Sequence, residues 1–181
     1  MSQEQLADVA GGRSIEERVA LAMPTYLLRV IYAGAARLPP GSYLRRRILK
    51  RTFRRAFDGA ARDDYEYVLL GYEPDVELRM LGDAPRTLGL AESYHGHQGL
   101  RDLLGDMKRD MINLRWEVEQ IVDLGDRIAA RATAVGTGAL SGVTTRNTVG
   151  YISWISPRGT IMRLDVYWTW DETLAALEQP E

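Results

Sequence analysis

The chain has 181 residues, which suits one domain built around a single hydrophobic core. Apolar residues make up 45% of it and charged residues 27%, a balance typical of globular rather than disordered proteins. The net charge is −2, so no overall field selects nucleic acid, and the lack of cysteine excludes disulfides, thiolate catalysis and cysteine-based metal sites.

The N-terminal region does not predict a membrane anchor or a signal peptide. Its most apolar run, residues 19–28, is about half the ~20 residues that a membrane span needs. Pro24 interrupts this run and Arg29 ends it. The first residues also lack the basic start of a signal peptide. We therefore expect a cytoplasmic protein.

Helical patterns come first along the chain. Residues 1–14 read as a polar tail, and residues 15–37 predict a helix that Ser14 caps and Pro24 kinks or splits. The run Leu38-Pro39-Pro40-Gly41 is a firm stop. We expect residues 1–40 to form a helical extension and residues 41–178 to form the main domain.

The next predicted helix, residues 42–61, has two contrasting faces. Apolar residues recur at three- to four-residue spacing, and the other face holds Arg45, Arg46, Arg47, Lys50, Arg51, Arg54 and Arg55. Such a basic stripe could contact nucleic acid or anionic lipid. It could also be a solvated helix face balanced by acids elsewhere. We favour the solvated face and expect neither a nucleic acid nor a membrane partner, because no base-reading motif accompanies the charge.

The remaining pattern changes from helices to strands. We expect a short helix at 65–70, a strand at 76–81, a loop at 82–93 and a helix at 98–111. Strands follow at 115–124, 127–137, 147–155 and 160–170, and a short helix closes the chain at 171–177. This order predicts an α+β fold, with N-terminal helices packed on a curved antiparallel sheet around a cone-shaped cavity.

Several short motifs resemble the nuclear transport factor 2-like superfamily. They are residues 62–64 (RDD), 72–76 (YEPDV), 94–100 (YHGHQGL), 124–127 (LGDR), 141–143 (SGV), 159–161 (GTI) and 165–168 (DVYW). Relatives in this superfamily include steroid delta-isomerases, SnoaL-like polyketide cyclases, scytalone dehydratase and limonene epoxide hydrolase. The resemblance covers about residues 42–178 and implies the cone-shaped fold, which hosts many functions.

The catalytic residues of these relatives can be carried over position by position. The isomerases' proton-abstracting aspartate falls on Arg79 or Met80, and their oxyanion-hole tyrosine falls near Ala56. Their second oxyanion donor falls on Tyr151, whose hydroxyl can still donate. Of the Asp-Arg-Asp set of the epoxide hydrolases, only the arginine is matched, by Arg127. The resemblance therefore implies neither mechanism, and it leaves Tyr151 as the polar anchor.

Two further groups are candidates for catalysis. His95 and His97 are the only histidines, and either of them, His97 in particular, could act as an acid or base near neutral pH; alternatively, the histidine after Tyr94 simply bonds the turn backbone. Asp165 could be a buried acid if it faces the cavity, and an interface or structural ion-pair residue if it does not. We expect no metal, because a histidine pair with no third ligand in sequence reach is a poor site.

Alternation along the last strand separates two sets of residues. The resemblance places Met162, Leu164, Val166 and Trp168 toward the cavity, and Arg163 and Asp165 on the convex face, where relatives form dimers. We therefore expect a homodimer through the convex face of the sheet. The residues expected to bind a ligand are Tyr72, Tyr94, Trp116, Leu164, Val166 and Trp168.

The sequence thus supports two functions. The first is the binding of a small hydrophobic molecule in the cavity, with or without cofactor-independent isomerase, cyclase or lyase chemistry by Tyr151, His97 or Asp165. The second is a non-enzymatic binding or interaction module. An enclosed cavity would favour the first, and a filled cone with an exposed apolar patch outside it would favour the second.

Overall fold

The computed structural model describes residues 13–23 and 25–178 of the chain. Its helices are α2 (Ile15–Ala22), α3 (Thr25–Ala36), α4 (Tyr43–Ala61), α5 (Tyr65–Leu69), α6 (Ala84–Leu88), α7 (Gly96–Arg109) and α8 (Trp170–Glu178). Its strands are β1 (Tyr72–Leu81), β2 (Ser93–His95), β3 (Met111–Asp123), β4 (Arg127–Gly138), β5 (Thr144–Ile155) and β6 (Ile161–Tyr167). None of the described helices is long and apolar enough to cross a membrane.

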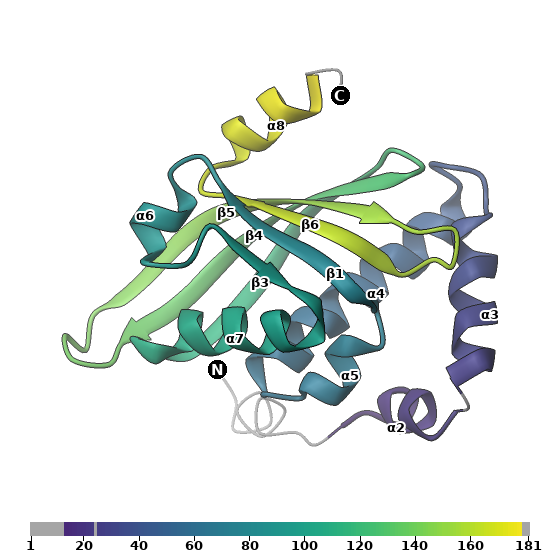
Figure 1. Ribbon diagram of the computed structural model, residues 1–181, viewed down its shortest axis with the longest axis horizontal. Coiled ribbons are helices and arrows are strands. Elements are labelled where there is room, and N and C mark those ends of the chain that lie inside the picture. The colour runs from purple at the N-terminus through teal and green to yellow at the C-terminus, as the bar shows by residue number, and fades with distance from the viewer. Residues whose placement is uncertain (1–12, 24, 179–181) are drawn as a thin grey trace, which may run out of the picture.

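The six strands form one sheet in the order β2-β1-β6-β5-β4-β3. Its strand pairs are antiparallel except for β1 and β6, which run parallel. Figure 1 shows α4, α5 and α7 on one side of this sheet and α8 on the other. The structure therefore confirms the α+β prediction of a sheet packed against helices.

The hydrophobic core lies between the sheet and the helices α4 and α7. On α7, Leu100, Leu103 and Leu104 recur at helical spacing and are buried against the sheet. On β4, small residues such as Ala130 and Ala132 face the same core. Their short side chains leave room for larger groups from the helices.

Some element boundaries differ from those expected. The helix predicted over residues 15–37 is split into two helices, which is one of the two outcomes expected for it, and Pro24 between them lies outside the described residues. The loop predicted over 82–93 contains α6 and leads into β2. Strand β1 begins earlier than expected, at Tyr72, and its pairing with β6 is interrupted by an irregularity that spans Pro74.

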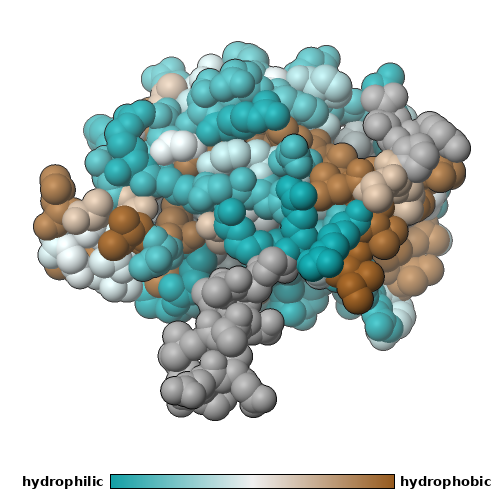
Figure 2. Space-filling view, turned by 90° about the horizontal axis from the view of Figure 1, so that it is seen from below, coloured by the Kyte–Doolittle hydropathy of each residue, from teal (hydrophilic) through white to brown (hydrophobic). Residues whose placement is uncertain are grey.

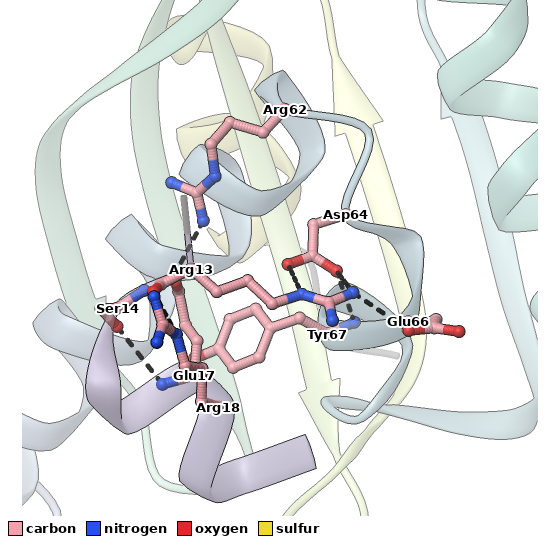
Figure 3. Close-up of polar contacts among 8 residues, drawn as sticks. All are labelled: Arg13, Ser14, Glu17, Arg18, Arg62, Asp64, Glu66 and Tyr67. Carbon is pink, nitrogen blue, oxygen red and sulfur yellow. Dashed lines mark hydrogen bonds and ion pairs between the residues drawn. The ribbon is translucent and has the colours of Figure 1, made fainter. Parts of the chain in front are cut away.

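The helical extension is held by polar contacts rather than by a broad apolar interface. Ser14 and Glu17 form a capping box at the start of α2, and Glu17 also pairs with Arg62 at 2.9 Å. Arg13 donates to Asp64 through two bonds of 2.8 Å (Figure 3). These contacts tie the first helix to the end of α4 and the start of α5.

Arg45 corrects the expectation that the basic residues of the second predicted helix share one exposed face. Its side chain is buried, and it donates to the carbonyls of Ala36, Leu38 and Gly125. Its Nε atom lies 2.9 Å from a carboxylate oxygen of Asp123, which is buried as well. Arg45 therefore joins the end of α3, the start of α4 and the turn between β3 and β4.

Candidate functional site

A cavity of about 140 Å³ lies inside the cone. Its walls are the inner faces of α4 and α7 and the strands β3 to β6, and the residues Tyr32, Ala35 and Ala36 of α3 close its mouth. Most of its lining is apolar, as with Phe53 and Phe57 of α4. The cone is therefore not filled by its own side chains.

Besides Tyr32 of α3, two tyrosines of the sheet belong to this mostly apolar lining. Tyr72 stands at the start of β1, and Tyr151 stands on the cavity face of β5. Burial raises the pKa of Tyr72 to about 12, and it raises the pKa of Tyr151 further. Both phenols are therefore neutral hydrogen-bond donors near neutral pH rather than bases.

An aromatic cluster positions the Tyr151 ring. Phe57 of α4 lies between two rings of the sheet, 5.3 Å from the ring centre of Tyr151 and 5.7 Å from that of Trp116. The Trp116 indole offsets part of the rise in the pKa of Tyr151, yet its N–H reaches no acceptor in full hydrogen-bond geometry. A buried indole N–H without an acceptor is costly, so a ligand oxygen near it would be favoured.

Ser153 adds a further polar group to the wall. It lies two residues after Tyr151 on the same strand face, it is fully buried, and its hydroxyl has no partner among the described residues. Arg45 also lies in the wall, but its guanidinium already serves the carbonyls named above. None of the described lining residues is Asp, Glu or His. The wall thus offers hydrogen bonds but no titratable base.

Both histidines lie outside this lining. His95 is exposed at the start of α7, and the ring Nε2 of His97 lies 3.1 Å from the backbone carbonyl oxygen of Tyr72. His97 thus contacts the first residue of β1, and this contact holds the beginning of β1 against α7. Among the described residues, no cluster of three or more His, Asp or Glu could hold a metal ion.

Asp165 lies on the face of the sheet opposite the cavity. It is fully buried and accepts hydrogen bonds from Arg79 at 2.8 Å and 2.5 Å and from Arg163 at 3.1 Å and 2.9 Å. Arg163 in turn stacks on the Trp154 ring at 3.9 Å. This arrangement fits the ion-pair alternative stated for Asp165, and it provides no contact with the cavity.

Four of the six expected ligand-binding residues line the cavity, namely Tyr72, Trp116, Leu164 and Val166. Tyr94 does not, because its hydroxyl donates to Asp106 and accepts from the Ala91 amide beside α7. Trp168 packs against the edge of the core, outside the lining.

Met162 is the clearest exception to the predicted alternation. Trp154 pairs with Arg163 while Ile155 pairs with Ile161, so Met162 is an extra residue in a β-bulge and is half exposed. The bulge reverses the parity of the strand before it, so Ile161 lines the cavity instead.

The contribution of α3 to the cavity was not predicted. Tyr32, Ala35 and Ala36 belong to the expected extension, yet they complete the cavity. Gly159 in the turn between β5 and β6 lines it as well, beside the backbone of Tyr32. The run of small residues at 33–36 is the one feature that could have indicated a close approach of this helix to the domain.

Residues 53–171 match the SnoaL-like domain family. An NTF2-like protein of unknown function from Burkholderia pseudomallei has a similar structure, with a TM-score of 0.58 and 18% identity over 72% of this chain and 97% of its own. A proposed SnoaL-like polyketide cyclase from Jannaschia sp. has a TM-score of 0.55 and 16% identity over 72% of this chain and 92% of its own. TerC, which was co-crystallized with polyporic acid, has a TM-score of 0.57 and 20% identity over 71% of this chain and 97% of its own. No curated protein matches the chain in sequence.

Proposed function

Because the chain belongs to the SnoaL-like domain family, we propose that it binds a small, uncharged hydrophobic molecule in the cone-shaped cavity. The observation that carries this proposal is the cavity of about 140 Å³ with its mostly apolar wall. An engineered apolar cavity of about 150 Å³ in another protein binds benzene. The body of the ligand in the closed cavity is therefore about the size of one six-membered ring.

The polar groups of the wall define the other half of the ligand. Trp116 can only donate a hydrogen bond, and the neutral hydroxyls of Tyr72 and Tyr151 can donate as well. A ligand with a carbonyl or ether oxygen would supply the missing acceptor. A charged ligand would lie in an apolar wall without a free counter-charge, which is costly.

If the protein is an enzyme, the same donors set its chemistry. A hydrogen bond to a carbonyl oxygen stabilises the negative charge that develops there in an isomerisation, cyclisation or elimination. We assign this donor role to Tyr151, because its hydroxyl lies within the lining and stays protonated. His97 and Asp165 take no part in it, since neither lines the cavity.

A non-enzymatic interaction module is the second candidate. The observation that favours it is a set of exposed apolar side chains on α2 and α3, such as Val30 and Ile31. Such a module was expected to have a filled cone as well, and the cone is hollow. Ligand binding therefore accounts for more of the structure.

Calorimetric titration of the full chain with 2-cyclohexen-1-one and with cyclohexene tests the proposal. These probes share a ring of fitting size, and only the first has an acceptor oxygen. We expect the enone to bind several-fold more tightly, because one hydrogen bond contributes about 0.5–1.5 kcal/mol. The variant Ala56→Leu, which fills part of the cavity, should bind neither probe. Equal binding to this variant and the natural chain would contradict the proposal.

The expected homodimer through the convex face stays a prediction. That face carries polar pairs, with Arg146 bonded to Glu117 at 2.6 Å and Arg131 to Glu119 at 2.7 Å. Helix α8 covers part of the same face, where its Thr173 packs against Gly150. A dimer formed there would therefore bury polar groups as well as apolar ones.

A further inference from the structure

Exposed apolar side chains gather on the N-terminal helices. Of the 13 large apolar side chains that are exposed in the described part of the chain, seven lie between residues 15 and 44. They are Ile15, Val19, Leu27, Val30, Ile31, Tyr43 and Leu44. Figure 2 shows an apolar surface at the same end of the molecule, where α2 and α3 lie.

Helix α3 is apolar on both of its sides. Tyr32, Ala35 and Ala36 face the cavity, whereas Val30 and Ile31 are 65% and 54% exposed on the outer side. A helix that is apolar all round is normally buried on all sides. The residues that the structure describes leave this outer side of α3 uncovered.

The charge of the helical region differs sharply from that of the rest of the chain. Residues 13–62 hold 12 basic and three acidic side chains, and residues 63–181 hold 11 basic and 20 acidic ones. Glu16 pairs with Arg51 and Arg55. The net charge of −2 for the whole chain does not reveal this asymmetry. Arg13 and Arg45 are neutralised by acids of the other part, Asp64 and Asp123, but the helical region still keeps an excess of positive charge.

Besides Arg46, whose side chain donates to the Gly41 carbonyl, three cations of α4 are exposed and form no ion pair with the described residues, namely Arg47, Lys50 and Arg54. They follow the exposed Tyr43 at helical spacing, so all four residues share one stripe of the helix. Arg45 holds the start of α4 against the end of α3 through the carbonyls of Ala36 and Leu38. The cationic stripe thus begins beside the apolar side of α3.

We propose that this surface, formed by the outer residues of α2 and α3 and the cationic stripe of α4, docks on an anionic lipid bilayer. Exposed aliphatic side chains beside lysine and arginine are the combination that binds the interface of such a membrane. The proposal replaces the expectation that the basic helix face is merely solvated. Because Tyr32, Ala35 and Ala36 of the same helix line the cavity, docking places α3 between the cavity and the bilayer.

Two other occupants fit this surface less well. A second copy joined through the same surface in a two-fold dimer would bring the positive ends of both molecules together. Nucleic acid would account for the cations but not for exposed residues such as Ile15 and Val30. An anionic bilayer accounts for both features at once.

Sedimentation of the full chain with lipid vesicles tests the proposal. One set of vesicles contains equal parts of phosphatidylcholine and phosphatidylglycerol, and the other contains phosphatidylcholine alone. We expect binding to the anionic vesicles at low salt, a progressive loss as salt is added, and much weaker binding to the neutral vesicles. Absence of binding to the anionic vesicles at low salt would overturn the proposal.

Two variants separate the cationic and apolar contributions. The triple variant Arg47→Gln, Lys50→Gln, Arg54→Gln should partition roughly 100-fold less, because each Lys or Arg near an anionic surface contributes about a factor of five. The double variant Val30→Ser, Ile31→Ser should bind at least about 10-fold more weakly. All five side chains are exposed, so both variants should keep the stability of the natural chain.

Matched controls lie on other parts of the molecule. Leu140→Ser changes a fully exposed apolar residue at the tip of the β4–β5 hairpin, and Arg86→Gln, Arg101→Gln, Arg115→Gln changes three exposed cations of the acidic part. Both controls should keep their vesicle binding. Equal losses in variants and controls would overturn the assignment of the surface. A dimer of the natural chain in analytical ultracentrifugation, lost in Val30→Ser, Ile31→Ser, would instead identify the surface as a self-interface and overturn the bilayer proposal.

Discussion

The backbone of Gly159 lies against the backbone of Tyr32, where the β5–β6 turn meets α3. A Cβ atom at position 159 would overlap the Tyr32 carbonyl group and lie 2.9 Å from the backbone nitrogen of Ala33. Gly159 also has a φ of +80°, a conformation that side chains with a Cβ rarely adopt. The β5–β6 turn therefore packs directly against α3 and holds this helix in its place over the cavity.

Replacing Gly159 with alanine should loosen α3. The variant must give up either the turn conformation or the contact with Tyr32, so we expect the free energy of unfolding to fall by about 2 kcal/mol or more. Amide hydrogen exchange in α3 should become faster as well. Gly89→Ala is the matched control, because Gly89 has a φ of +65° and open space around it. Equal effects of both changes would contradict the role of the contact.

Tyr151→Phe should weaken the binding of 2-cyclohexen-1-one about 3- to 10-fold, the effect of losing one hydrogen bond. The affinity for cyclohexene, which has no acceptor, should stay the same. Tyr65→Phe, which removes a hydroxyl bonded to Asp63 outside the cavity, serves as the control in the same titration. Because burial raises the pKa values of Tyr72 and Tyr151, the affinity of the natural chain should be constant between about pH 6 and pH 9. A loss of affinity over that range would contradict the donor role.

Asp165→Asn should destabilise the protein without changing ligand binding. It removes a buried carboxylate that two arginines share, and breaking such a pair costs about 3–5 kcal/mol. Asp126→Asn, at an exposed carboxylate, should change the free energy of unfolding by less than about 0.5 kcal/mol. Urea unfolding and the enone titration measure the two effects. Loss of ligand affinity in a folded Asp165→Asn protein would show that the carboxylate acts on the cavity.

Glu73 should contribute to stability in a pH-dependent way. Burial alone would raise its pKa, but hydrogen bonds from Thr160 and Ser156 and the ion pair with Arg158 outweigh it and lower the pKa below 4.5. A carboxylate with a lowered pKa stabilises the folded state above its unfolded pKa and loses this contribution as the pH falls.

Urea unfolding near pH 7 and near pH 3.5 therefore separates Glu73→Gln from the natural chain. The variant should be less stable near neutral pH, and the two proteins should become more alike in acid. Glu66→Gln, at an exposed carboxylate, should follow the natural chain at both values. A constant difference between Glu73→Gln and the natural chain at both pH values would contradict the assignment.

The sequence predicts the long elements because their periodicity is strong. Helices α4 and α7 and strands β3 to β6 repeat apolar residues with clear helical or alternating spacing. Strand β2 and helix α6 are too short to carry such a signal, since they have three and five residues. The bulge at Met162 escapes prediction for another reason, because an extra residue changes the parity of a strand without leaving a mark in the pattern.

Some residues of the cavity lining could be predicted from the sequence, and others could not. Tyr151, Leu164 and Val166 follow from alternation along strands whose direction the resemblance supplies. The burial of Arg45 could not be predicted, because the sequence does not distinguish an arginine that is buried and bonded to carbonyls from the solvated arginines beside it. The contribution of Tyr32 depends on a contact with Gly159, 127 residues away, for which local spacing carries no information.

Helix α3, which covers the cavity, and most of the cavity wall come from different parts of the chain. The family match begins at residue 53, after Tyr32, Ala35 and Ala36 and also after Arg45, which holds α3 in place. The sheet and the helices packed on it thus form most of the cavity wall, and helix α3, which covers the cavity, comes from a separate segment of the chain. Larger or smaller side chains on the inner side of α3 would change which molecules enter the cavity, while the sheet and its other helices would still fold.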